Sequence, residues 1–348
     1  MDKKTIQVKS LFRPAIIVPA AVVLVLCLLP QFIKGYPLHT LTLIILYAAL
    51  GSAWNWLGGF AGQASLAHAV FFGLGAYINS MLQVHFEVNP WVAMLVAMAG
   101  VGIISILVGL PVFRLSGPYF SIATIAIGEV VKIIFINWKA TGGAVGMYLP
   151  IRESSLLNFQ FNDKAPYYYI ILAFYFVAVS ITYWLKNSRS GYYFRAIKED
   201  PQAAKALGIN IVQSKLLAMV LSGMMCAMVG SFYVNFTLYI DPDNVFRFMT
   251  SVQIALIAVL GGVGSVWGPL IGSVIILLLS EGSRAYLGGI GAGLDFVIYG
   301  LMIMLIAIFQ PNGIIGAVEN YRKKKRLKKR QMQEATDAAK EVGDHGAA

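Results

Sequence analysis

The sequence places a few ionisable side chains inside long apolar runs, where a charge is costly and usually functional. Glu129 and Lys132 lie three residues apart in "IGEVVK", so on a helix they would share one face and could pair. His68 follows a glycine cluster, and its imidazole can exchange protons near neutral pH. Two interpretations are open for these residues. They could couple protons to transport, or they could serve as an ion pair between helices and a hydrogen-bonded packing residue.

Two apolar runs are interrupted by glycine clusters, "LGGFAGQASLAHAVFFGLGAY" at 57–77 and "VLGGVGSVWGPLIGSVI" at 259–275. Glycine costs about 1 kcal/mol in a helix interior and proline about 3 kcal/mol. Irregular backbone in a membrane must be covered by protein or line a cavity, and interrupted segments often mark a translocation site. Close helix packing through small residues is the alternative. The candidates for a translocation path are Gly62, Gln63, Ser65, His68, Gly117, Glu129, Gly261 and Gly262.

The sequence contains no pattern typical of an enzyme. It has no His and Cys cluster at metal-binding spacing, no nucleophile elbow and no pair of carboxylates within one apolar run. It also lacks the GxxxxGK[ST] loop that holds nucleotide phosphates. We therefore expect a chain with no catalytic residue, metal or cofactor of its own. If the chain takes part in energy-driven transport, the energy comes from another polypeptide or from an ion gradient.

A short polar helix is predicted at "DPQAAKALG", residues 200–208, within the longest basic loop. Asp200 is a candidate N-cap, Pro201 takes the first helical position, and Gly208 is a typical stop. The residues expected on its apolar face are Ala203, Ala204 and Leu207. A helix of about seven residues is marginal in water and needs a surface to dock on. We expect that surface to belong to a cytoplasmic partner, with the bilayer as the alternative.

The composition is that of a membrane protein. Of the 348 residues, 58% are hydrophobic and 12% are charged, whereas soluble domains carry about a quarter charged residues. Runs of about 20 apolar residues, the length needed to cross the hydrocarbon, recur along the chain. We predict an all-α polytopic membrane bundle in which glycine interrupts some helices. Its ten expected spans are 15–33, 38–57, 64–84, 91–113, 119–138, 167–185, 215–239, 248–262, 266–281 and 293–310.

The basic residues predict how these spans are oriented. A cytoplasmic N-terminus puts twenty of the 27 lysines and arginines on the cytoplasmic side and six outside, as the positive-inside rule requires. With ten spans, both termini are then cytoplasmic. The basic C-terminal tail, residues 317–348, is expected to contact anionic membrane lipid rather than nucleic acid. The expected parts are a cytoplasmic segment 1–14, a transmembrane domain 15–316 with a cytoplasmic loop 186–214, and a basic tail 317–348.

Several long motifs resemble one transporter family. The segment "RAIKEDPQAAKALGINIVQSKLLAMVLSGMMCAMVGSFY", residues 195–233, strongly resembles the cytoplasmic coupling loop of permease subunits of branched-chain amino acid ABC importers. The resemblance extends through "GQASLAHAVFFGLGAY", "LSGPYFSIATIAIGEVVK", "TGGAVGM" and "VLGGVGSVWGPLIGSVI" to "VIYGLMIMLIAIFQPNGIIG". The resemblance covers about residues 40–316. Within the family, the chain is similar to the M-type subunit in particular.

The resemblance implies a subunit of the bacterial inner membrane that forms a heterodimer with a second, homologous permease. Two cytoplasmic ABC ATPases, which would hold the ATP and Mg²⁺, and a periplasmic or surface-anchored binding protein would complete the importer. The outer loops, including 141–166, would then contact the binding protein. The residues that match the ATPase-docking segment are Arg195, Ala196, Glu199, Asp200, Ala203, Ala204, Leu207 and Gly208.

The resemblance also implies a substrate class, namely branched-chain or related neutral amino acids. Relatives of this architecture import urea or other amino acids, so a urea or amide permease stays open as an alternative. A second alternative is an ion-coupled secondary transporter that uses Glu129, Lys132 or His68. Dependence on a partner ATPase separates an importer from such a transporter.

Overall fold

The computed structural model describes residues 25–287, 297, 300–301, 304 and 313–316. The expected N-terminal segment 1–14 and basic tail 317–348 lie outside the described residues. Most of the first and last expected spans, 15–33 and 293–310, lies outside them as well.

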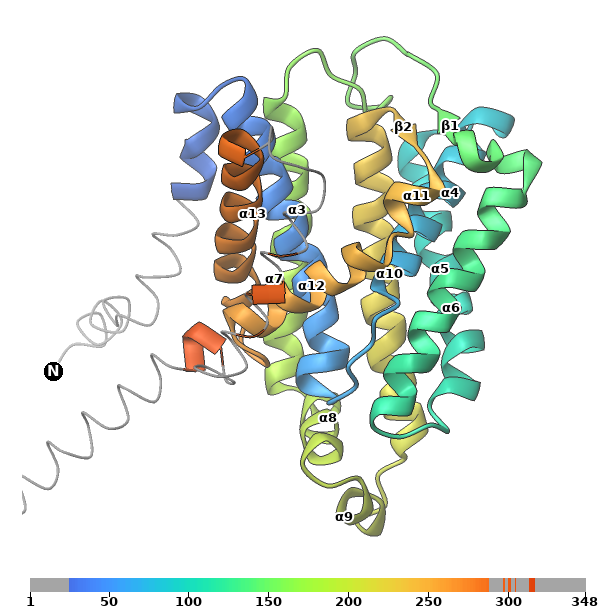
Figure 1. Ribbon diagram of the computed structural model, residues 1–348, viewed down its shortest axis with the longest axis vertical. Helices are drawn as coiled ribbons and strands as arrows, with labels where there is room; N and C mark the ends of the chain where they lie inside the picture. Colours follow the sequence, from blue (N-terminus) through green and yellow to red (C-terminus); the bar gives the residue numbers. More distant parts are fainter. Residues whose placement is uncertain (1–24, 288–296, 298–299, 302–303, 305–312, 317–348) are drawn as a thin grey trace, which may run out of the picture.

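The described chain is a bundle of helices with one short pair of strands (Figure 1). A helix at residues 25–32 precedes α3. The labelled elements are α3 (Tyr36–Trp54), the π-helix η1 (Asn55–Phe60), α4 (His68–Phe86), α5 (Pro90–Val112), α6 (Pro118–Asn137), the 3-10 turns η2 (Lys139–Thr141) and η3 (Gly143–Val145), β1 (Met147–Tyr148), α7 (Ala165–Asn187), α8 (Arg189–Glu199), α9 (Pro201–Ala206), α10 (Ile211–Thr237), β2 (Tyr239–Ile240), α11 (Pro242–Val245), α12 (Phe248–Gly261) and α13 (Gly268–Leu287).

Within the described residues, six helical segments are long and apolar enough to cross a membrane. They are α3 with η1, α5, α6, α7, α10, and α11 with α12. The helices α4 and α13, with 19 and 20 residues, occupy two further expected spans. The prediction of a polytopic helical bundle is therefore confirmed, whereas the total of ten spans and the cytoplasmic termini stay predictions.

Proline and polar caps fix where the helices begin. Pro90 and Pro118 open α5 and α6 at the first helical position, where a missing N–H costs no hydrogen bond. The side chain of Asn89 accepts a hydrogen bond from the Trp91 backbone N–H at 2.9 Å and so caps α5. These local signals explain why the expected spans 91–113 and 119–138 agree closely with the helices.

The centre of the bundle is α10, which packs most extensively against α4 and α5 (Figure 1). Its contact with α4 depends on two small residues. A Cβ atom added to Gly230 would lie 2.0 Å from the Phe72 carbonyl oxygen, and one added to Gly75 would lie 2.3 Å from the Ala227 Cα. The two backbones therefore approach each other as closely as glycine permits.

Buried amides tie the same two helices together. The Gln83 side chain donates to Oδ1 of Asn79 at 2.6 Å and to Oδ1 of Asn235 at 3.1 Å, and all three side chains are almost completely buried. Asn235 in turn donates to Asn79 at 3.1 Å. A polar network that is buried and hydrogen-bonded in this way fixes the register of α4 on α10.

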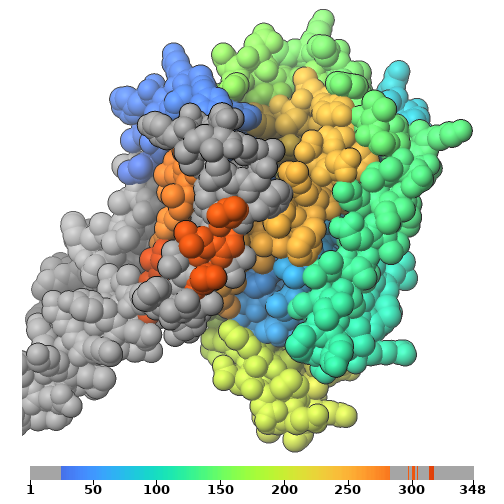
Figure 2. Space-filling view, in the orientation of Figure 1, coloured from blue at the N-terminus to red at the C-terminus, as the bar shows by residue number. Residues whose placement is uncertain are grey.

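The two ends of the bundle differ. At one end β1 pairs antiparallel with β2, with Met147 opposite Ile240 and Tyr148 opposite Tyr239. At the other end α8 and α9 project from the body, at the bottom of Figures 1 and 2. The β1–β2 pair and the α8–α9 pair therefore lie at opposite ends of the described bundle.

Candidate functional site

The first glycine cluster breaks the chain between η1 and α4. Residues 61–67 are irregular, so the expected span 64–84 begins as a helix only at His68. The structure covers part of this irregular backbone with protein, whereas Gly62 and Ala64 are exposed. The Trp54 indole N–H donates to the Ser65 carbonyl at 2.8 Å, and the Leu66 N–H donates to Oγ1 of Thr124 at 3.0 Å. The polar backbone therefore has partners on α3 and α6, as a low-dielectric setting requires.

The second glycine cluster lies against the first. The Asn55 side chain of η1 donates to the Ser265 carbonyl at 2.9 Å and accepts from the Gly264 N–H at 2.8 Å. A Cβ atom added to Gly59 would lie 2.9 Å from the Gly264 nitrogen. The two interrupted segments, 55–67 and 261–268, form one contact region, which we call the glycine junction.

The α8 helix is attached directly to this junction. The Lys198 ammonium donates to the Gly59 carbonyl at 3.0 Å. Gly62 has a φ of 70°, which favours glycine, and a Cβ atom there would lie 3.0 Å from Cγ of Lys198. The end of α8 therefore contacts the backbone of the interrupted segment that follows α3.

The predicted short helix is present as α9. The Asp200 side chain accepts hydrogen bonds from the N–H groups of Gln202 and Ala203, at 2.8 and 3.1 Å. Gly208 adopts a φ of 81° and ends the helix, and its N–H donates to the Lys205 carbonyl at 3.0 Å. The start and stop predicted from the sequence are confirmed.

The expected apolar face of α9 is wrong in one respect. Ala204 is only 2% exposed, so it packs on its own chain and is not available to a partner. Leu207 is 80% exposed and Ala203 is also exposed, so these residues point outward. The sequence identifies the small and apolar residues of α9, but it does not show which side of α9 packs against the rest of the chain. Only the tertiary arrangement decides that.

Sequence reasoning did not separate α8 from α9. The Ser188 side chain caps α8 by accepting from the Gly191 N–H at 3.2 Å, and Phe194 and Ile197 are buried. Of the remaining docking candidates, Arg195 donates to the Lys186 carbonyl at 2.9 Å, which holds α8 against the end of α7. The other two, Ala196 and Glu199, lie on the last turn of α8 as partly buried and exposed residues.

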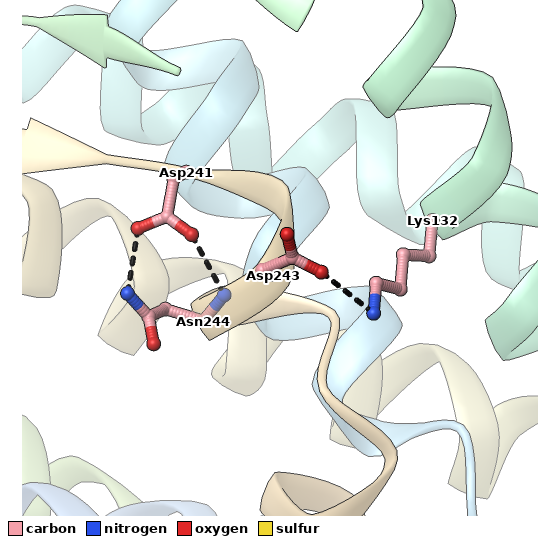
Figure 3. A network of polar contacts seen from close by, with 4 residues as sticks. All are labelled: Lys132, Asp241, Asp243 and Asn244. Atoms are coloured by element: carbon pink, nitrogen blue, oxygen red, sulfur yellow. Dashed lines mark hydrogen bonds and ion pairs between the residues drawn. The ribbon is translucent and has the colours of Figure 1, made fainter. Parts of the chain in front are cut away.

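The ionisable residues of the spans have partners that the sequence did not predict. Lys132 of α6 pairs with Asp243 of α11 at 2.8 Å (Figure 3), so an ion pair between helices is confirmed for Lys132, although its partner is not Glu129. His68 is completely buried, and its Nε2 lies 2.8 Å from Oγ of Ser222 on α10. Within the described residues, no hydrogen-bonded chain joins these groups.

The structure brings most of the translocation candidates to the glycine junction and leaves two apart. Gly117 precedes α6, and Glu129 lies exposed on that helix. The candidates in or beside the junction are Gly62, Gln63, Ser65, His68, Gly261 and Gly262. The described residues contain no group of three His, Cys, Asp or Glu side chains that could hold a metal ion.

A cavity of about 280 Å³ is lined by residues of α3, α4, α10, α11, α12 and α13. Its charged lining residues are Arg247 and Glu281, and Glu281 also accepts a hydrogen bond from Tyr36. Leu46, Phe72 and Leu277 contribute apolar walls. A cavity with a cation, an anion and an apolar wall can orient a small zwitterion.

Sequence reasoning missed Asn55, Lys198 and Arg247. Asn55 did have a signal, because it is an amide inside the apolar run that precedes the first glycine cluster. Lys198 had none, because its partner Gly59 lies 139 residues away in sequence.

The comparisons with known proteins agree with this architecture. A family model described as the branched-chain amino acid transport system permease component matches residues 36–307. The permease protein LivM of the high-affinity branched-chain amino acid transport system of Escherichia coli strain K12 is 24% identical over 298 residues, which cover 79% of this chain and 68% of that protein. The corresponding LivH of Salmonella typhimurium strain LT2 is 27% identical over 290 residues, covering 78% and 92%. No solved structure matches the chain.

The matched range begins with α3 and continues beyond α13. It therefore contains both sides of the glycine junction, the α8–α9 loop and all six apolar segments long enough to span a membrane. These findings indicate a multi-pass membrane protein, and the chain belongs to the family of branched-chain amino acid transport system permease components.

Proposed function

We propose that this chain is a membrane-spanning permease subunit of an ABC importer of branched-chain amino acids in the bacterial inner membrane. Its partners are a second, homologous permease, two cytoplasmic ATPases that carry ATP and Mg²⁺, and an external binding protein. The family supports the transport role. Escherichia coli K12 has permease proteins named LivM and LivH for the high-affinity branched-chain amino acid system, which supports a pair of permeases.

The observation that carries the proposal is the contact of Lys198 with Gly59 at 3.0 Å. This contact joins α8 to η1, the interrupted segment that follows α3. Through Asp200, α8 leads directly into the exposed helix α9. In the proposed mechanism an ATPase binds α9 through contacts with the exposed side chain of Leu207. Its closure moves α8 as a rigid body, and Lys198 transfers the displacement to the glycine junction.

Asn55 extends the same path. Because it bonds both Ser265 and Gly264, movement of η1 displaces the segment between α12 and α13 as well. Both interrupted segments then shift together, which is the way a pathway can close at one end and open at the other.

The cavity next to α11 and α13 suits the proposed substrate class. The Arg247 guanidinium can bind a carboxylate, and the Glu281 carboxylate can accept from an ammonium group. An aliphatic side chain would lie against Leu46 and Leu277. A urea or amide substrate lacks both charges, so it would use this lining less fully.

The proposed docking of α9 is tested by Leu207→Glu in the assembled importer. We expect the variant to insert normally but to lose ATP-driven uptake, because the charge would have to be desolvated against the ATPase. Leu207→Met, which keeps an apolar side chain, should retain uptake. Uptake by reconstituted vesicles and co-purification of the ATPases are the measurements. Unchanged uptake and ATPase binding in Leu207→Glu would refute the docking role.

The substrate is tested with the associated binding protein, titrated against leucine, isoleucine, valine and urea. We expect the three amino acids to bind and urea not to bind. Selective binding of urea would support the amide alternative instead. Uptake that persists without the ATPases and collapses with an uncoupler would support the ion-coupled alternative.

A further inference from the structure

The outer surface of α6 carries a carboxylate at a depth where lipid cannot solvate it. Glu129 is exposed and is the twelfth residue of the 20-residue helix. At about 1.5 Å per residue it lies roughly 16 Å from the start of α6, near the middle of a hydrocarbon layer of about 30 Å. A charged side chain at that depth faces protein or water rather than acyl chains.

This helix is also poorly covered by its own chain. Only 17% of the residues in its most apolar stretch are buried, compared with 72% for α10. The exposed residues Ile122, Ala126, Glu129 and Ile133 follow each other at helical spacing, so they form one stripe. The stripe combines large apolar side chains with one carboxylate.

A second helix with a large exposed surface, α5, provides a comparison. Every exposed residue of α5 is apolar, for example Ile103, Ile106, Leu107 and Leu110. The polar residue Ser105 on the same helix is buried. The surface of α5 is therefore matched to acyl chains along its length, and the stripe on α6 is not.

An ion pair between α6 and the neighbouring helix α11 lies one turn from Glu129. Lys132, one turn after Glu129, reaches across to Asp243 on α11 (Figure 3). Asp243 keeps 66% of its side chain exposed in this ion pair. The carboxylate of Asp241 accepts from the N–H and the side-chain amide of Asn244, which orients α11 beside α6. We call the stripe together with Asp243 the α6 face.

We propose that the α6 face packs against the homologous permease chain and that Glu129 is buried in this contact. An aqueous surface would leave Ile122 and Ile133 unburied, and a lipid surface would leave Glu129 unsolvated. A protein partner that offers both apolar side chains and a cation or hydrogen-bond donor satisfies the whole stripe. This inference rests on the proposed function, which supplies the second permease, and it adds the face at which the two chains meet.

Site-directed photo-crosslinking in the complete importer tests the interface. Single cysteines are introduced at Ile122 and Ile133 in a chain whose Cys27 and Cys226 have been replaced, and each is labelled with a benzophenone reagent. The matched control is Ile103→Cys on α5, because Ile103 and Ile122 are both 61% exposed. We expect the probes on α6 to capture the homologous permease and the probe on α5 to capture lipid alone.

Capture of lipid alone, or of a second copy of this chain, by both α6 probes in an importer that still contains the homologous permease would overturn the interface. The proposed function would then still stand. A purified importer with no second permease would refute the proposed function itself, and the interface with it. As a second readout, Glu129→Leu should reduce co-purification of the homologous permease by on the order of tenfold, the loss expected for one buried polar contact. Unchanged or improved recovery would show that this position faces lipid.

Discussion

At the scale of single residues, the proposed mechanism depends on side chains that bridge segments far apart in sequence. Lys198 and Asn55 each contact a carbonyl group that lies in a glycine-interrupted segment. Such carbonyls are free to accept because the helix that would have used them is broken. The bridging residues therefore link the interruptions mechanically and also satisfy their backbone.

The bridge from α8 is tested by Lys198→Met, which keeps most of the side-chain volume and removes the ammonium group. We expect uptake to fall by about tenfold or more, the loss expected for a charge-assisted hydrogen bond. Binding of the ATPases should be retained, because α9 is unaltered. The matched control is Lys205→Met on α9, whose side chain is exposed. Equal effects of the two substitutions would argue against a specific role for Lys198.

Residue partners were the part of the site least predictable from sequence. The sequence allowed Lys132 to pair with Glu129 or to form an ion pair between helices, but it could not identify Asp243 of α11 as the partner. Local spacing shows which residues share a face, and only the tertiary arrangement shows what lies opposite that face. The burial of Ala204 was missed for the same reason.

At the scale of elements, capping decides whether the exposed helix α9 exists at all. It has six residues, so its own backbone hydrogen bonds cannot hold it together in water. The Asp200 carboxylate supplies two acceptors at its start, and Gly208 provides the left-handed turn at its end. The docking element is therefore preformed before any partner arrives.

Removal of the cap should loosen this element. We expect Asp200→Ala to cost about 0.5–2 kcal/mol of local stability, whereas Asp200→Asn should keep the cap because asparagine is an equally good N-cap residue. Backbone hydrogen exchange of residues 202–207 measures the difference, and ATP-driven uptake should decrease in Asp200→Ala. Equal exchange in Asp200→Ala and the unaltered protein would contradict the capping role.

The elements themselves were largely predictable. The expected spans 91–113 and 248–262 agree within one residue at each end with α5 (Pro90–Val112) and α12 (Phe248–Gly261). Their limits are set by proline, polar caps and glycine, which act locally. Residues 64–67 of the irregular stretch 61–67 were instead included in the expected span 64–84, because the hydrogen-bond partners of this stretch lie on other helices.

At the scale of the whole molecule, the bundle is organised around the close contact of α4 with α10. Small residues let the two backbones meet, and buried amides fix their register. Because α4 begins at the glycine junction, this contact also gives the junction a rigid support. In the proposed mechanism, motion transmitted by α8 would act on the junction without displacing the centre of the bundle.

The close contact predicts a contrast between two glycines. In Gly230→Ala the new methyl group would lie 2.0 Å from the Phe72 carbonyl, so α4 and α10 must separate, and the expected cost is at least 1–3 kcal/mol. Gly282→Ala on α13 has no described heavy atom within 4 Å of the new carbon and should be neutral or slightly stabilising. Thermal unfolding in detergent measures both. A Gly230→Ala protein as stable as the unaltered chain would show that the helices can adjust.

The hydrogen bonds of the broken segment also have a consequence for synthesis. The Ala69 N–H in the first turn of α4 donates to Oγ of Ser251, which follows it by 182 residues. At about 5–20 residues per second, a ribosome needs roughly ten seconds or longer to deliver that acceptor. Until then the acyl chains of the lipid offer no hydrogen-bond acceptor for the Ala69 N–H. The nascent chain must therefore be sheltered by the insertion machinery or the headgroup layer until Ser251 has been made and can accept this hydrogen bond.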